Sequence, residues 1–120
     1  MRYLFLLNSP GGGPAAEPGT PESERLFREW GEATALMADA GVLIDCAPLT
    51  PAASATTLRV RDGEVLLTDG PSAELKEWVG GYTLVECDDL DQALKWASTL
   101  PAARDSSIEV RAVIDTGRGR

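Results

Sequence analysis

The spacing of apolar residues predicts strands at 3–7, 42–46, 82–87 and 108–114, and helices from about residue 20 to 40 and from 89 to 100. The run Tyr3–Leu7 is continuously apolar, which is typical of a strand buried on both faces. The last strand alternates instead, with Glu109 and Arg111 set between apolar residues. Strands and helices are therefore expected to follow one another along the chain.

Both predicted helices have start and stop signals. Thr20-Pro21-Glu22 offers a capping hydroxyl, a proline at the first helical position and an acid in the first turn, and Gly41 follows the last turn. Asp89 is placed to cap the second helix, with Gln92 at the capping-box position, and Pro101 should end it. The stripes expected to be buried are Leu26, Phe27, Trp30, Ala33, Thr34, Met37 and Ala40, then Leu90, Ala93, Leu94, Ala97 and Leu100.

Residues 56–68 predict a β-hairpin. Asp62-Gly63 is a strong two-residue turn signal between two alternating segments. That turn would pair Arg61 with Glu64, Val60 with Val65, Leu58 with Leu67, and Thr56 with Asp69. Opposite charges and apolar side chains would then meet across the strands, which supports this register.

The order of these elements predicts one α+β domain over residues 1–115, with a flexible tail at 116–120. A ferredoxin-like arrangement fits, with two helices on one face of a mainly antiparallel sheet of about five strands. Two helices cover only one face of such a sheet. We therefore expect a homodimer in which a second subunit covers the other face.

Composition bounds the class of protein. The chain has 120 residues, 43% of them hydrophobic and 25% charged, with a formal net charge of −8. That charge disfavours nucleic acid and anionic membranes as partners. The opening apolar run ends at Asn8, too soon for a signal peptide, and no segment is long enough to span a membrane. A cytoplasmic protein with reduced, semi-buried Cys46 and Cys87 is expected, and without histidine we expect no metal and no cofactor.

Two further patterns have plain explanations. Gly11, Gly13 and Ala16 match G-x-G-x-x-A, but prolines crowd the segment and the chain is too short for a dinucleotide fold. We interpret residues 8–19 as a flexible loop. The acids at 88, 89 and 91 precede a helix, where they complement its dipole without requiring a metal.

The segment from Thr68 to Glu77 organises the functional analysis. Asp69-Gly70-Pro71 should turn the chain at a strand end, because Gly tolerates positive φ and Pro fixes φ. A short helical turn is predicted at 73–78, bearing Glu74, Lys76 and Glu77. Gly80-Gly81 would then release the chain into the next strand.

The sequence of residues 68–77 resembles the signature of the DGPF proteins, a branch of the YCII-related family. Ser72 stands in place of the usual Phe, and Leu75 in place of a usual Thr. The resemblance implies a dimeric α/β barrel of ferredoxin-like subunits, each with a pocket between sheet and helices. Some YCII-related members are thought to use a His and Asp pair, and this chain has no His. DGPF proteins are also often encoded beside alternative sigma factors.

Asp69 is the candidate catalytic base, and Arg59, Glu74, Lys76 and Tyr82 are candidate ligand-binding residues. Asp69 could instead cap its own turn, and the others could be solvated surface residues. One hypothesis is a small-molecule-binding dimer with a pocket near Asp69 and modest acid–base chemistry. The others are a non-catalytic regulatory protein linked to sigma factors or stress, and a cofactor-free oxygenase.

Overall fold

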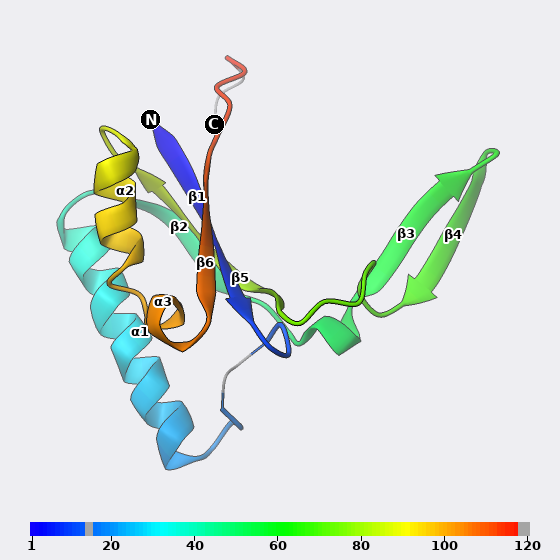
Figure 1. Cartoon of the computed structure of the whole chain (residues 1–120), viewed down its shortest axis with the longest axis horizontal. Coiled ribbons are helices and arrows are strands. Elements are labelled where there is room, and N and C mark those ends of the chain that lie inside the picture. Colours follow the sequence, from blue (N-terminus) through cyan, green and yellow to red (C-terminus); the bar gives the residue numbers. More distant parts are fainter. Residues whose placement is uncertain (14–15, 118–120) are drawn as a thin grey trace.

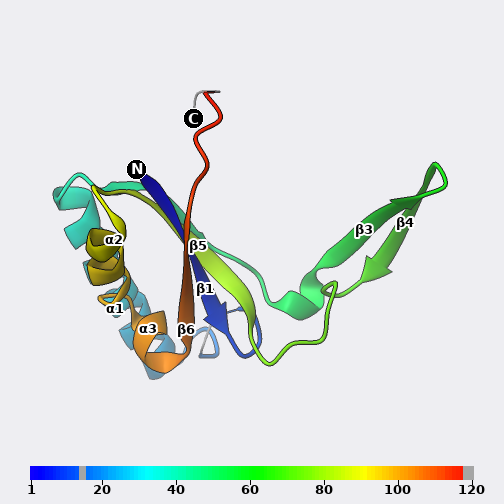
Figure 2. The same cartoon turned by 45° about the horizontal axis from the view of Figure 1, so that its top comes forward.

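The body of the protein is a four-stranded antiparallel sheet with helices on one side (Figures 1 and 2). The computed structural model describes residues 1–13 and 16–117. Strand order is β2-β5-β1-β6. The sheet strands are β1 (Arg2–Ser9), β2 (Leu43–Pro48), β5 (Trp78–Glu86) and β6 (Ser107–Ala112), and the helices are α1 (Pro21–Asp39), α2 (Leu90–Ala97) and α3 (Pro101–Asp105). This confirms the α+β class and the ferredoxin-like arrangement, with three described helices instead of the two predicted.

The core lies between the sheet and the helices. Alternate residues of the central strand, Tyr3, Phe5 and Leu7, are buried there. They pack in one cluster with helix residues such as Met37 and Leu100. Because β1 pairs with β5 on one side and β6 on the other, it fixes the register of the whole body.

The opposite face of the sheet is open. Leu4 and Leu6 of β1 and Leu84 of β5 share this face and are only half-buried. The expectation that Tyr3–Leu7 is buried on both faces is therefore wrong for the single chain. The three helices all lie on the other side, so nothing from the described chain covers the centre of this face.

The helix signals are largely confirmed. The Thr20 hydroxyl accepts a hydrogen bond from the amide of Ser23 at 3.1 Å, and Asp89 accepts one from the amide of Gln92 at 2.9 Å. The buried stripes are narrower than predicted, because Phe27 is 80% exposed and Ala40 is exposed. Leu90 and Leu94 are also exposed, whereas Ala93, Ala97 and Leu100 are buried as predicted. Pro101 does not simply stop a helix: it begins α3.

The hairpin of β3 (Thr56–Arg61) and β4 (Glu64–Asp69) has the predicted register at every pair. Asp62 and Gly63 both have positive φ, 52° and 79°, as the tight turn requires. It is not part of the main sheet, however, but a separate two-stranded sheet. Figures 1 and 2 show it projecting from the body, on the side of the sheet away from the helices. A sheet of about five strands was therefore a wrong expectation.

The segment between β4 and β5 differs from the prediction. Residues 73–78 form no helical turn, and Trp78 already begins β5, so Gly80 and Gly81 lie inside a strand. Gly80 is needed there, since a Cβ would stand 3.0 Å from Ser9 Oγ and 3.2 Å from the backbone of Gly12. The described part of the loop after β1 is held at Gly11, whose carbonyl accepts a hydrogen bond from the Ala52 amide at 3.0 Å. Residues 14 and 15 of the predicted flexible loop lie outside the described residues.

Three smaller expectations remain. The predicted tail lies partly outside the described residues, which end at Gly117. Both cysteines are unpaired; Cys87 is buried as a core residue, whereas Cys46 is exposed and not semi-buried. In the described part of the chain, no helix is both long and apolar enough to cross a membrane.

Candidate functional site

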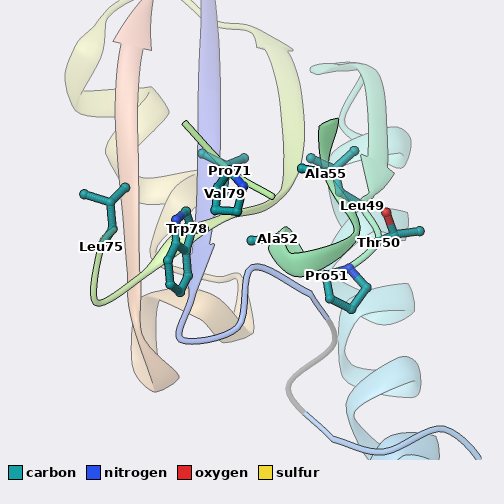
Figure 3. A pocket seen from close by; sticks show the side chains of 9 residues that line it. All are labelled: Leu49, Thr50, Pro51, Ala52, Ala55, Pro71, Leu75, Trp78 and Val79. Carbon is teal, nitrogen blue, oxygen red and sulfur yellow. The ribbon is translucent and has the colours of Figure 1, made fainter. Parts of the chain in front are cut away.

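An apolar groove lies at the foot of the hairpin, beside the segment that the sequence singled out (Figure 3). Its volume is about 400 Å³, within the range of small-molecule sites. The lining residues come from two stretches of chain: the segment between β2 and β3, and the segment from the turn after β4 to the start of β5. They are Leu49, Thr50, Pro51, Ala52, Ala55, Pro71, Leu75, Trp78 and Val79.

Hydrogen bonds to backbone carbonyl groups hold these two stretches in place. The Leu49 amide donates to Gly80 O at 2.9 Å, which ties the first segment to β5. The Gly70 amide donates to Ala55 O at 2.7 Å, which closes the foot of the hairpin. The Trp78 indole N–H donates to Ala73 O at 3.0 Å, which fixes the loop between β4 and β5. The groove is thus built on anchored backbone.

The close approach of glycines completes the floor. Gly12 has φ of +65°, and a Cβ there would lie 2.8 Å from the Cβ of Trp78 and 2.9 Å from that of Ala52. Only a residue without a side chain allows this crossing. The glycines after β1 therefore pack the base of the groove, which explains them without a nucleotide.

The chemistry of the groove is apolar. Among its lining residues only Thr50 has a polar side chain apart from the indole of Trp78, and the Thr50 hydroxyl already accepts a hydrogen bond from Ser54 Oγ at 2.8 Å. No lining residue carries a charge. Such a surface suits an apolar or aromatic group and offers no ionisable side chain for acid–base catalysis within the groove itself.

The candidate charged residues lie near the groove but do not line it. Asp69 is exposed at the end of β4, opposite Thr56 as predicted, while Pro71 two residues later does line the groove. Within residues 1–13 and 16–117, no hydrogen bond or ion pair joins the side chain of Asp69, Glu74 or Lys76 to another group. The alternative in which Asp69 caps its own turn is therefore not what the structure shows, and its role in a site stays a prediction.

Arg59 and Tyr82 lie away from the groove. Arg59 is exposed on β3, opposite Leu66. Tyr82 lies on the open sheet face, where its hydroxyl donates to Asp45 Oδ2 at 2.8 Å. That hydrogen bond is the main cause of a raised pKa of Tyr82. The five candidates are thus not gathered at one place, and sequence reasoning missed Leu49, Trp78 and Val79, whose only sequence signal was the density of prolines and glycines around them.

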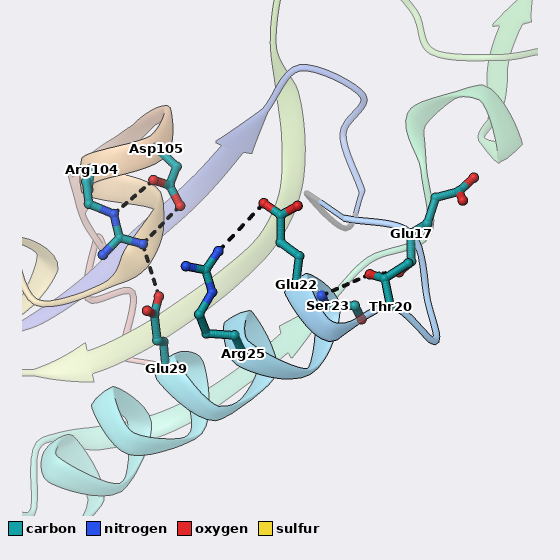
Figure 4. A network of polar contacts seen from close by, with 8 residues as sticks. All are labelled: Glu17, Thr20, Glu22, Ser23, Arg25, Glu29, Arg104 and Asp105. Atoms are coloured by element: carbon teal, nitrogen blue, oxygen red, sulfur yellow. Dashed lines mark hydrogen bonds and ion pairs between the residues drawn. The ribbon is translucent and has the colours of Figure 1, made fainter.

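A second cavity, of about 520 Å³, lies between the end of β1, α1 and α3. Charged side chains from the two helices line it together with Ser9, Pro10, Gly11 and Leu26. Figure 4 shows its charged groups: Arg104 Nη2 lies 3.0 Å from Glu29, Arg104 Nε lies 2.9 Å from Asp105, and Arg25 lies 3.7 Å from Glu22. The pair of Arg104 and Glu29, which joins the two helices, was not predicted, because nothing in the sequence places α3 beside α1.

The charges of this second cavity satisfy one another. Hydrogen bonds to Asp105 and then Glu29 raise the pKa of Arg104, and the hydrogen bond from Arg104 lowers the pKa of Asp105. The arginine is thus already occupied by two carboxylates of its own chain. We interpret this network as a link between α1 and α3. Among the residues that the structure describes, this cavity included, no three Cys, Asp or Glu side chains stand close enough to hold a metal ion.

Comparison with known proteins places the chain in a family. The family model described as the YCII-related domain matches residues 1–116. A curated relative from Rhizobium meliloti (strain 1021), "Uncharacterized protein R00369", is 41% identical over 92 residues, which are 75% of this chain and 74% of the relative. The family match over residues 1–116 spans both the sheet body and the hairpin. The chain therefore belongs to the YCII-related domain family.

Proposed function

We propose that this protein binds a small, largely apolar molecule in the groove at the foot of the hairpin. The observation that carries the proposal is the composition of the lining: nine residues from two anchored stretches of chain, with Trp78 among them and no charge. A planar or aromatic group could stack on the indole and displace water from the prolines and aliphatic side chains around it.

The groove fits this role better than the cavity between α1 and α3. In that cavity each arginine already faces carboxylates of the same chain, so an anionic ligand would have to compete with them. A ligand of the apolar groove would compete only with water. Burying an apolar group yields about 25 cal/mol for each Å² removed from water.

A thermal-shift screen over aromatic, aliphatic and charged compounds tests the proposal, because binding to the folded state raises its stability. Apolar and aromatic compounds should raise the melting temperature. Leu75→Asp, which sets a charge in the lining, should weaken the binding of each hit by about tenfold or more. Leu36→Asp is the matched control, since Leu36 lies on α1 with a similar exposed fraction, 59% against 55%. Compounds whose binding is weakened equally by both substitutions, or by neither of them, would contradict the proposal.

Acid–base chemistry at the rim is a finer proposal. Asp69 is an exposed carboxylate without a partner in the described chain, two residues from Pro71 in the lining. If it acts as a base on a ligand held in the groove, Asp69→Asn should abolish turnover of that ligand. Stability should change by no more than about 1 kcal/mol. Unaltered turnover in Asp69→Asn would remove Asp69 from the mechanism and leave a binding protein.

A second candidate function is a non-catalytic regulatory or interaction protein. The resemblance of Thr68–Glu77 to the DGPF signature supports membership of that branch, and through it a link to sigma-factor-associated transcription or stress. The projecting hairpin supports this candidate too, because it offers a surface for a protein partner. Capture of a sigma factor by the purified protein, lost on deletion of 57–68, would favour it over ligand binding.

A further inference from the structure

The charged residues that flank the apolar groove are mostly acids. Leu75 lines the groove, and its neighbours along the chain are Glu74 and Lys76. Trp78 also lines it, and Glu77 comes directly before it. Consecutive Cα atoms are about 3.8 Å apart, so the backbone of each of these charged residues adjoins the lining. Two acids and one base therefore border the groove on this side.

The turn after β4 adds a third acid. Asp69 is exposed and stands two residues before Pro71, which lines the groove. The stretch 69–79 thus contains three acids and one base, a formal charge of −2. The other stretch of the lining, 49–55, contains no charged residue that would offset this excess, and the whole chain carries −8. The rim of the groove is therefore negative.

These charges are available to a ligand. Within residues 1–13 and 16–117, the side chains of Asp69, Glu74 and Lys76 form no hydrogen bond or ion pair with another group. The Glu77 carboxylate accepts a hydrogen bond from Ser107 Oγ at 2.7 Å, but this neutral partner leaves its negative charge in place. The cavity between α1 and α3 differs, because its arginines already face carboxylates of the same chain.

The indole of Trp78 favours the same sign of ligand charge. Its N–H donates to Ala73 O at 3.0 Å, so this donor is already used and does not serve an anionic ligand. The face of an indole ring carries negative electrostatic potential and attracts cations. Trp78 is half-buried and belongs to the lining (Figure 3). The one aromatic side chain of the groove and the acids of its rim thus both favour positive charge.

We propose that the groove takes an amphipathic cation, with its apolar body against Trp78 and Leu75 and its ammonium group at the rim, near the acids. The inference rests on the proposed function and adds the charge of the ligand. Burial of the body removes apolar surface from water. The ammonium group stays hydrated at the exposed rim, so it gains attraction without the cost of burying a charge. An apolar anion would meet net repulsion, with Lys76 as the only opposite charge in the stretch 69–79.

Three compounds with the same naphthalene body and different charges provide the test. At neutral pH, naphthylmethylamine is a cation, naphthylmethanol is neutral and naphthoate is an anion. Isothermal titration at low salt should show the amine binding about three- to tenfold more tightly than the alcohol, and the anion more weakly than the alcohol. In about 1 M NaCl the amine and the alcohol should bind equally within about twofold, because charges are then screened beyond about 3 Å. An anion that binds as tightly as the amine would overturn the inference.

Substitutions that each remove one negative charge separate the rim from the overall charge of the protein. Asp69→Asn and Glu74→Gln should each weaken binding of the amine by about two- to threefold, and the double variant should bring it to the level of the alcohol. Glu64→Gln is the matched control, since Glu64 is exposed on β4 but lies five residues, about 17 Å, from Asp69. It should leave binding of the amine unchanged. Equal effects of all three substitutions, or no effect of the first two, would overturn the inference.

The neutral alcohol distinguishes failure of this inference from failure of the proposed function. Its binding should fall about tenfold or more in Leu75→Asp and stay unchanged in Leu67→Ser. Leu67 belongs to the apolar face of the hairpin, the four exposed residues Leu58, Val60, Val65 and Leu67. Binding of the alcohol that depends on Leu75, with no preference for the amine, would overturn only the charge of the ligand. Absence of binding by all three compounds, or binding that depends on Leu67 instead, would overturn the proposed function and this inference with it.

Discussion

The central strand β1 and the hairpin β3–β4 use similar residues but end in opposite environments. On β1, Phe5 is fully buried beneath the helices. On β4, Leu67 is 65% exposed, although it too has an apolar residue opposite it. The hairpin register is as well specified as that of the body, but its apolar face has no partner within the described chain. Local pairing is therefore encoded independently of the surface that buries it.

The largest difference between the two regions is expected when one apolar side chain in each is truncated to alanine. Phe5→Ala should lower the free energy of unfolding by about 3–5 kcal/mol, because it opens a cavity in the core. Leu67→Ala should change it by less than about 0.5 kcal/mol at concentrations where the chain is monomeric. Urea unfolding followed by circular dichroism measures both. A large loss of stability for Leu67→Ala in the monomer would mean that the apolar face of the hairpin is buried within its own chain.

The second largest effect on stability is expected at Gly12, which packs closely beneath the groove. Gly12→Ala should lower the free energy of unfolding by roughly 2–5 kcal/mol, since the new Cβ meets Trp78 and Ala52 and the backbone is left-handed. Gly19→Ala is the matched control, because Gly19 also has positive φ but nothing within 4 Å of a new Cβ. It should cost about 1–2 kcal/mol. Equal losses would show that backbone conformation alone, and not close packing, requires Gly12.

A substitution in the turn of the hairpin should destabilise only the hairpin and not the body of the protein. Gly63→Val places a β-branched residue at φ of +79°, which costs roughly 1–3 kcal/mol. Hydrogen exchange at the amides of 56–69 should speed up, while exchange at 2–9 stays unchanged. Faster exchange in β1 as well would show that the hairpin and the body unfold as one unit.

The smallest effect is expected at the link between α1 and α3. Arg104→Gln should lower stability only slightly, because the ion pairs are exposed. The pKa of Asp105 is lowered in the folded state, so its contribution is present above the ordinary value of 3.8 and is lost as pH falls through the lower folded pKa. The difference between wild type and Arg104→Gln in thermal unfolding should therefore shrink in acid. A difference that grows as pH falls would contradict this pairing.

Much of the fold could be predicted because its signals are local. The Asp62-Gly63 turn fixes the hairpin register, and the caps at Thr20 and Asp89 fix two helix starts. The detachment of the hairpin from the main sheet could not be predicted, since the same alternation serves a strand in either sheet. The short helix α3 is not predicted, because Pro101, its first residue, also reads as a stop signal for the helix before it.

The site was harder to predict than the fold. Charge drew attention to Asp69, Glu74 and Lys76, but the groove beside them is lined by apolar residues from two stretches that are far apart in the sequence. The close packing at Gly12 and Gly80 and the hydrogen bonds between the stretches bring them together, and no local sequence pattern reports these contacts. Pro71 and Leu75 alone connect the predicted motif to the observed groove.

The mass of the wild-type chain in solution is the most direct test of the predicted homodimer, in which a second copy covers the open face of the main sheet. Sedimentation equilibrium at micromolar concentration should give about twice 12.7 kDa. The mass should fall toward that of one chain on dilution, together with loss of exchange protection in 56–69. A mass of 12.7 kDa at every concentration, with the amides of the hairpin equally protected from exchange throughout, would contradict the account.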